Sequence, residues 1–293
     1  MPSLSLSAAC KAVPFQTLKP CERETSVTAE SIDIQNTFFA QFGVGRPHLL
    51  LDYDGTLSAF RVDRFQSHPW AGVREVLRTI QNSSNTKLAI ITGRPAHEIA
   101  PMLQLDLPLE VWGLHGAERL YPDGRRELEA ASPEVQQALE HLREHLRHDS
   151  LGGLFEDKAN GAVMHWRGHS RKKAAEIERR ARDLFEPLAR MEGLTLLDFE
   201  SGVELRVGRN KGGAVDAILA ETDNGGPVAY LGDDLSDESA FRSVQRLGKR
   251  GFSGLVRREW RETAAAVWMR PPAEVLAFLE RWASVQQSLF GVA

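Results

Sequence analysis

Short apolar runs and segments of helical periodicity alternate along most of the chain. Three runs, at 49–51, 88–91 and 227–231, contain almost no polar side chains. Such runs are typical of strands that are buried on both faces of a parallel sheet. The segment between the first two runs carries apolar residues at the spacing of one helix face, namely Val73, Val76, Leu77 and Ile80. The pattern predicts an alternating α/β fold.

The same alternation of apolar runs and helical segments is found in the first and last parts of the chain after residue 46. Three further elements are predicted: a strand at 109–116, a strand at 265–269 and a closing helix at 272–286. Lys211 opens another helix. We therefore expect a Rossmann-like parallel-sheet core that is built from two separate parts of the chain, 47–118 and 208–293.

The stretch between these two parts has a different pattern. Residues 119–125 predict a hairpin turn that leaves the sheet. Ser132 and Pro133 predict a helix start, because a capping hydroxyl and a proline in the first turn favour initiation. Two strands follow at 153–158 and 162–167, then a long helix at 171–190, and then two more strands at 194–199 and 203–207. The order helix-strand-strand, found twice, predicts an inserted α/β cap at 119–207.

The N-terminal 46 residues are rich in Ser, Thr, Ala and Pro. We expect residues 1–46 to form an N-terminal extension that is partly disordered, with one helix at about 29–42. Its apolar side chains either pad the main body or form a partner-binding helix, and the first alternative is favoured.

Composition restricts the class of partner. The 36 basic residues stand against 40 acidic ones, a net charge of -4, so no global basic field attracts nucleic acid or an acidic membrane. No apolar run approaches the roughly 20 residues that span a bilayer. Cys10 and Cys21 form neither a redox motif nor a disulfide framework. We expect a cytoplasmic protein with a small-molecule partner.

Two carboxylates follow the first buried strand. Asp52 and Asp54 are two residues apart, so both would project into the crevice beyond the strand end. Their repulsion is relieved by a raised pKa or by a cation, and hard oxygen ligands suit Mg2+. A solvated Asp-Tyr-Asp-Gly turn is the alternative.

Other strand ends and one helix start carry complementary groups. Thr92, before Gly93, suits a bound phosphate or caps the next helix. Lys211 opens a helix, and Asp233 and Asp237 follow the strand at 227–231. If these groups meet, they equip a phosphate-transfer centre: a nucleophilic carboxylate, a proton-transfer carboxylate, a lysine, a hydroxyl and a Mg2+ site.

The motifs DYDGTL, ITGR, NKGGAV and GDDLSDE, in this order, resemble those of the haloacid dehalogenase superfamily of phosphatases. The resemblance implies that Asp52 is the nucleophile and Asp54 the acid–base group. It matches Thr92 and Lys211 to the remaining catalytic positions. It implies a Mg2+ site made by Asp52, the backbone carbonyl of Asp54, Asp233 and Asp237, with Asp237 in a supporting place.

From residue 47 onward the chain resembles the trehalose-phosphatase family, through LDYDGTL, GLHGAE, FEDKANGAVMHWR, VELRVGRNKGGAV and GDDLSDE. This implies a core of the haloacid dehalogenase type and trehalose 6-phosphate as substrate. Sugar contacts are implied at Glu156, Lys158, Arg167 and Glu204, and further substrate contacts at Arg94, His115 and Gly116. Cross-strand ion pairing is the alternative for the first group, and a structural role is the alternative for His115 and Arg94.

Three other functions remain open at this point. The substrate could be another sugar phosphate, such as a sucrose, glucosylglycerol or mannosyl-phosphoglycerate ester, because the fold does not select it. A regulatory module could bind a sugar phosphate without turnover. A nucleotide-binding protein is disfavoured, because no G-x-G-x-x-G or Walker lysine motif follows the first strand. We expect a monomer that is functionally coupled to a trehalose-6-phosphate synthase.

Overall fold

The computed structural model describes residues 27–61, 66–83, 85–148, 152–158, 161–199, 201–222 and 225–290. Cys10, Cys21 and the rest of residues 1–26, where partial disorder is predicted, lie outside this description. No helix within these ranges is both long and apolar enough to cross a membrane.

An eight-stranded sheet forms the core, in the order β12-β11-β10-β1-β2-β3-β4-β5. Its strands are β1 His48–Leu51, β2 Lys87–Ile91, β3 Glu110–Gly113, β4 Glu118–Leu120, β5 Arg126–Leu128, β10 Val228–Gly232, β11 Gly251–Val256 and β12 Val267–Met269. The six strands from β12 to β3 are parallel, and β4 and β5 are antiparallel. The carboxyl ends of β1, β2 and β10 therefore lie at one edge of the sheet.

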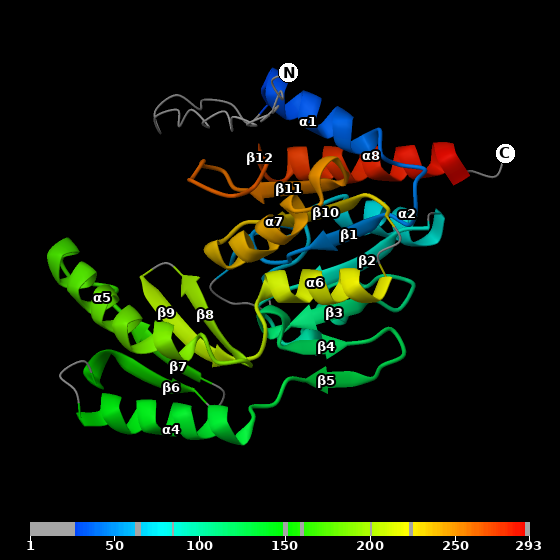
Figure 1. The fold of residues 1–293 in the computed structure, drawn as a ribbon. Helices are drawn as coiled ribbons and strands as arrows, with labels where there is room; N and C mark the ends of the chain where they lie inside the picture. Colours follow the sequence, from blue (N-terminus) through cyan, green and yellow to red (C-terminus); the bar gives the residue numbers. More distant parts are fainter. Residues whose placement is uncertain are drawn as a thin grey trace, which may run out of the picture.

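Helices cover both faces of this sheet (Figure 1). They are α1 Ala29–Phe39, α2 Val73–Ser83, α3 Ile99–Leu103, α6 Lys211–Thr222, α7 Glu238–Gln245 and α8 Ala273–Phe290, with short 3-10 turns η2 Ala96–Glu98, η3 Leu114–Gly116, η5 Leu235–Asp237 and η6 Gly248–Arg250. One buried cluster joins α1, α2, α3 and α8 to one face, and another joins α6 and α7 to the opposite face. Alternate residues of β1 supply both clusters, Leu49 and Leu51 on one side and Leu50 on the other. This explains why the strand carries no polar alternation.

A second, four-stranded antiparallel sheet forms the cap, in the order β6-β7-β9-β8. Its elements are α4 Pro133–His148, η4 Gly152–Leu154, β6 Phe155–Lys158, β7 Gly161–His165, α5 Arg171–Leu188, β8 Leu194–Phe199 and β9 Gly202–Val207. The predicted order helix-strand-strand, repeated once, is confirmed. Both helices pack on one face of this sheet through residues such as Leu142, Met164 and Phe185. The other face is left for the core, and β8 contacts η5 there.

Two linkers connect the cap to the core and are held together by one carboxylate. Glu129 of the first linker accepts hydrogen bonds from the backbone N–H and the Nε of Arg209 in the second linker, and the backbone bond measures 2.6 Å. Gly208, just before Arg209, has φ +101°, which a side chain rarely adopts. Asn210 then caps α6 by accepting the N–H of Gly213 at 2.9 Å.

Three features differ from the expectation. The strand predicted at 109–116 ends at Gly113, where the 3-10 turn η3 begins. The hairpin at 119–125 does not leave the sheet, because β4 and β5 add to its edge. Strand β11 was not predicted, since glycines at 251 and 254 and a serine at 253 interrupt its apolar pattern. Gly254 is needed there, because a Cβ would lie 2.6 Å from the Leu231 side chain. The residue limits of core and cap stay a prediction.

The N-terminal helix pads the main body, as favoured. Phe38 is 1% exposed and its ring centroid lies 5.3 Å from that of Phe252 and 5.9 Å from that of Trp282. Ile32, by contrast, is 47% exposed and does not join this cluster. The capping box between Thr28 and Ser31 fixes the helix start.

Truncation of Phe38 tests how much this helix contributes to the core. We expect Phe38→Ala to lower the free energy of unfolding by about 3–5 kcal/mol, because it leaves a cavity among aromatic rings. Ile32→Ala, on the exposed side of the same helix, should change it by less than about 0.5 kcal/mol. Urea unfolding followed by tryptophan fluorescence measures both. Equal, small effects would mean that α1 is not part of the folded core.

Candidate active site

A buried lysine joins two carboxylates at the carboxyl edge of the core sheet. Lys211 Nζ lies 2.9 Å from Asp52 Oδ1 and 2.7 Å from Asp237 Oδ1, and all three side chains are at most 4% exposed. Asp52 follows β1, Asp237 ends η5 after β10, and Lys211 is the first residue of α6. Burial alone would lower the pKa of Lys211, but Asp237 and Asp52 outweigh it and raise that pKa. The lysine is therefore a permanent cation.

Asp237 has all of its hydrogen-bonding capacity used inside the protein. Its Oδ1 accepts from Lys211 and from the Tyr230 hydroxyl at 2.5 Å, and its Oδ2 accepts from the N–H groups of Asp233 and Asp234 at 3.0 and 2.9 Å. This carboxylate orders the loop after β10. Sequence reasoning missed Tyr230, because a tyrosine within an apolar strand gives no signal beyond that of a core residue.

Three carboxylates could hold a divalent cation. One oxygen from each of Asp52, Asp233 and Asp237 lies within 4.8 Å of the others. A Cβ on Gly55 would overlap the Asp233 carboxylate, so the backbone there makes room for this group. Burial, then Asp52 and Asp237, raise the pKa of Asp233 well above its usual range. Such an excess of buried negative charge, with oxygen donors only, fits a hard cation. Because Asp237 is internally saturated, Asp52 and Asp233 are the better direct ligands.

Asp54 points to an arginine and lies outside that cluster. Arg94 Nε and Nη2 each donate to one oxygen of Asp54 at 2.6 Å, a bidentate pair. Arg94 Nη1 lies 3.6 Å from Glu98, and the arginine is 6% exposed. Hydrogen bonding to Asp54 raises the pKa of Arg94. The arginine thus fixes the orientation of Asp54, and a direct contact of Arg94 with substrate stays a prediction.

Thr92 and His115 lie on neighbouring backbone segments. Thr92 is 1% exposed, its Oγ1 accepts the N–H of Arg94 at 3.2 Å, and its own hydroxyl proton remains to be donated. It does not cap the next helix, whose N-cap is Pro95. The backbone N–H of His115 donates to the Thr92 carbonyl at 2.8 Å. The hydroxyl is therefore held at the site by backbone contacts.

His115 is half-buried between core and cap. Burial, then the charges of Lys211, Arg206 and Lys158, lower its pKa well below 6.5, so the ring is neutral. Its backbone has φ 58°. Gly116 follows at φ 109°, and a Cβ there would lie 2.8 Å from the Asn210 carbonyl oxygen, so both the conformation and the space require glycine. A neutral imidazole can both donate and accept a hydrogen bond. Substrate contacts of His115 and Gly116 stay predictions.

Three of the four predicted sugar ligands share the core-facing side of the cap sheet. Lys158 Nζ lies 3.3 Å from Glu204 Oε2, across the intervening strand β7. Glu156 pairs with His165 Nε2 at 2.9 Å. Arg167 lies in the turn after β7 and is exposed, and among the described residues no hydrogen bond joins it to the other three.

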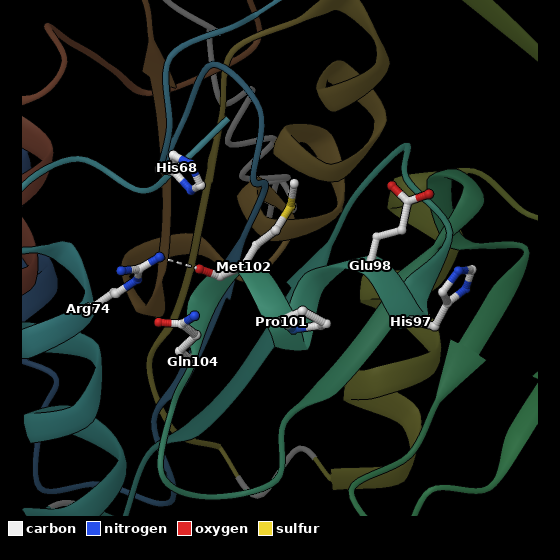
Figure 2. A pocket seen from close by; sticks show the side chains of 7 residues that line it. All are labelled: His68, Arg74, His97, Glu98, Pro101, Met102 and Gln104. Atoms are coloured by element: carbon white, nitrogen blue, oxygen red, sulfur yellow. Dashed lines mark hydrogen bonds between the residues drawn. The ribbon is translucent and has the colours of Figure 1, made fainter. Parts of the chain in front are cut away.

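A cavity of about 880 Å³ lies elsewhere on the core (Figure 2). It is lined by His68, Arg74, His97, Glu98, Pro101, Met102 and Gln104 and includes none of the carboxylates of the cluster. Glu98 lines this cavity and also lies beside Arg94, which pairs with Asp54. The chemistry therefore belongs to the strand ends and not to this cavity.

Comparison with known sequences identifies relatives of this chain. A family model described as Trehalose-phosphatase matches residues 50–265, a span that contains the carboxylate cluster, Lys211 and the whole cap. The chain is 31% identical over 258 residues to a trehalose-phosphate phosphatase of Mycobacterium marinum, covering 84% of this chain and 64% of that protein. The chain thus spans less than two thirds of this relative.

Solved structures show the same fold. A trehalose-6-phosphate phosphatase of Aspergillus fumigatus superposes with a TM-score of 0.70 at 23% identity, covering 85% of this chain and 97% of that chain. The C-terminal domain of a Candida albicans trehalose synthase regulatory protein reaches 0.58 at 15% identity, covering 84% and 97%. At these identities the likeness concerns the fold alone. The predicted α/β class, with a parallel-sheet core and an inserted cap, is confirmed.

The buried carboxylates predict how stability depends on pH and on metal. Burial raises the pKa of Asp52 from 3.8 to about 7, with Lys211 opposing and Asp237 adding to the shift. The folded protein keeps a proton that the unfolded chain releases, so stability is highest below the unfolded pKa and falls as the pH rises toward the folded pKa. We expect metal-free protein to melt at a lower temperature at about pH 7.5 than at about pH 5.5, and Mg2+ to raise Tm more at the higher pH.

Calorimetry of EDTA-treated wild type and Asp52→Asn measures this effect. The substitution removes one of the coupled carboxylates, so the pH dependence and the Mg2+ effect should both shrink. A wild type whose Tm does not differ from that of the variant at either pH, with and without Mg2+, would contradict the electrostatic account.

Proposed function

The chain belongs to the trehalose-phosphatase family, and from that premise we propose that it hydrolyses trehalose 6-phosphate to trehalose and phosphate in a Mg2+-dependent reaction. The observation that carries the proposal is the buried Lys211 between Asp52 and Asp237, with Asp233 beside them. This set combines a nucleophile, a cation and a metal site at one sheet edge.

Asp52 is the proposed nucleophile. Its Oδ1 is held by Lys211, and Thr56 Oγ1 lies 3.3 Å from its Oδ2. Attack of a carboxylate oxygen on phosphorus forms an aspartyl-phosphate and expels the sugar oxygen, which divides hydrolysis into two steps. Lys211 and the hydroxyl of Thr92 would stabilise the negative charge on the transferred group.

Asp54 is the proposed acid–base group. It first protonates the leaving trehalose oxygen and then takes a proton from the water that cleaves the aspartyl-phosphate. Its two oxygens each accept a hydrogen bond from Arg94, and this bidentate pair orients the carboxylate. To donate a proton to the leaving oxygen, one of these oxygens must be released by Arg94 when substrate binds.

Asp52, Asp233 and the backbone carbonyl of Asp54 would hold the Mg2+, with Asp237 ordering their loop. A bound Mg2+ neutralises charge on the phosphoryl oxygens and on the ionised carboxylates. Without it the buried carboxylates favour protonation, and a protonated Asp52 is a poor nucleophile.

The cap would select the sugar. Glu156, Lys158, Arg167 and Glu204 offer charged groups for the hydroxyls of a disaccharide, which has no other recognition feature. The Lys158–Glu204 pair and the contact between β8 and η5 support a cap that closes over the site and excludes water. His115 and Gly116 would contact substrate from the core.

Two alternatives are weighed against this proposal. A non-catalytic sugar-phosphate-binding module has the support of one structural likeness, to the Candida albicans regulatory protein domain. A module that only binds its ligand would not need Asp52, Asp54, Lys211 and Asp233 as a complete catalytic set. Another sugar phosphate as substrate would leave the core chemistry unchanged. A cytoplasmic location, a monomeric state and coupling to a trehalose-6-phosphate synthase stay predictions.

A substrate panel tests the function directly. We expect phosphate release from trehalose 6-phosphate with Mg2+, little from sucrose 6-phosphate or glucose 6-phosphate, and none with EDTA. Asp52→Asn should lose roughly a thousandfold or more in kcat, as removal of a nucleophile does, while its circular dichroism is unchanged. Equal activity across the panel would reject the substrate, and an active Asp52→Asn would reject the mechanism.

A single change in the cap tests its role in selection. Glu204→Gln should lower kcat/KM for trehalose 6-phosphate by about 10- to 100-fold, the scale of a charged hydrogen bond. Hydrolysis of p-nitrophenyl phosphate, which has no sugar, should stay within about twofold. Glu140→Gln, on the exposed side of α4, serves as the matched control. Equal losses on both esters would argue against sugar recognition by this residue.

A further inference from the structure

Arg206 is a buried cation for which the described residues supply no hydrogen-bond or ion-pair partner. It lies on β9, is 8% exposed, and its Nε is enclosed by protein with no hydrogen-bond acceptor. Across the described part of the chain, no hydrogen bond or ion pair to its guanidinium is found. Arginine is seldom buried unless it is paired, because the lost hydration must be replaced. An unpaired guanidinium at such a position indicates a ligand that supplies the missing acceptor.

The carboxylates near Arg206 are committed to other cations. Burial lowers the pKa of Arg206, and Glu204 and Glu129 only partly oppose this. Glu204 pairs with Lys158 at 3.3 Å, and Glu129 binds Arg209 through two hydrogen bonds. Among the described residues, neither carboxylate therefore forms an ion pair or a hydrogen bond with Arg206.

The position of Arg206 identifies the kind of ligand. The strand register places it opposite Gly161, which in turn lies opposite Lys158, so two cations flank a residue without a side chain. Arg206 is close in sequence to the linker that leads to Lys211. Glu156 and Glu204 lie on the same face of the sheet, two residues further along their strands from that linker. Lys211, Arg206 and Lys158 all act on the ring of His115. Of these three cations, Lys211 and Lys158 are already paired with carboxylates, so Arg206 is the one left to bind an anion near His115.

We propose that Arg206 binds the phosphoryl oxygens of the substrate from the cap side, opposite Lys211. The assignment rests on the proposed function and refines it. Because Arg206 belongs to the cap, its charge reaches the phosphoryl group only when the cap is closed. In the closed state, Arg206 would add a second protein cation, beside Lys211, that stabilises the negative charge on the transferred phosphoryl group. Bulk water is excluded there, which strengthens this interaction. The planar guanidinium can donate two parallel hydrogen bonds to a phosphate.

Calorimetric titration with inorganic phosphate and, separately, with trehalose, both in Mg2+, tests this assignment without turnover. We expect Arg206→Met to weaken phosphate binding by about tenfold or more and to leave trehalose binding within about twofold. Arg206→Lys, which keeps the charge but loses the fork, should be intermediate. Arg179→Met, on the exposed face of α5, should behave as wild type.

Thermal unfolding separates ligand binding from a structural role. A guanidinium that has no partner does not stabilise the empty protein, so Arg206→Met without ligand should melt at or above the wild-type temperature. A large fall in Tm would instead identify a structural residue and overturn the proposal. Weakened trehalose binding with unchanged phosphate binding would overturn it too, as would a wild type that binds no phosphate. A wild type that binds phosphate through Arg206 but does not hydrolyse trehalose 6-phosphate would reject the proposed function and leave this assignment standing.

Discussion

A lysine ammonium buried between two carboxylates is the interaction on which the rest of this structure depends. Charges with so little exposure must be paired closely, because their hydration is lost. The pairing therefore fixes the relative positions of three elements: strand β1, the loop after β10 and the start of α6. With Asp233 added, carboxylates outnumber the lysine, and the site is stable at neutral pH only with a further cation or with protons. The same repulsion between carboxylates that raises their pKa values also makes the cluster suitable for a divalent cation.

Sequence patterns were sufficient for the framework and for the residues that meet at its edge. Continuous apolar runs identified β1, β2 and β10, and parallel pairing then brought Asp52, Thr92 and Asp233 to one edge. Two features escaped because their physical cause is tertiary. The apolar pattern of β11 is broken by Gly254, which is required by contact with a neighbouring strand. The bidentate pairing of Asp54 with Arg94 joins residues 40 positions apart, and no local pattern encodes it.

The cap illustrates the limits of reading charge from sequence. Glu156, Lys158 and Glu204 were recognisable through the family motif, and the register brings them onto one face. Burial, however, is decided by what covers that face. Arg206 resembles an ordinary strand arginine in the sequence, yet it is enclosed, while Arg167 remains exposed. The fold alone does not define an activity, so the residues of the site have to carry that argument.

The two linkers join the cap to the core very close to Lys211. Gly208 supplies a flexible backbone, Arg209 is tied to Glu129, and Asn210 caps the helix that begins with Lys211. The two residues that follow the glycine, Arg209 and Asn210, are both held in place by hydrogen bonds. A change of backbone angle at Gly208 would move β9, whereas Lys211 would keep its own pairing with Asp52 and Asp237. The sequence and tilt of the cap can therefore diverge among related chains without altering the contacts of this lysine.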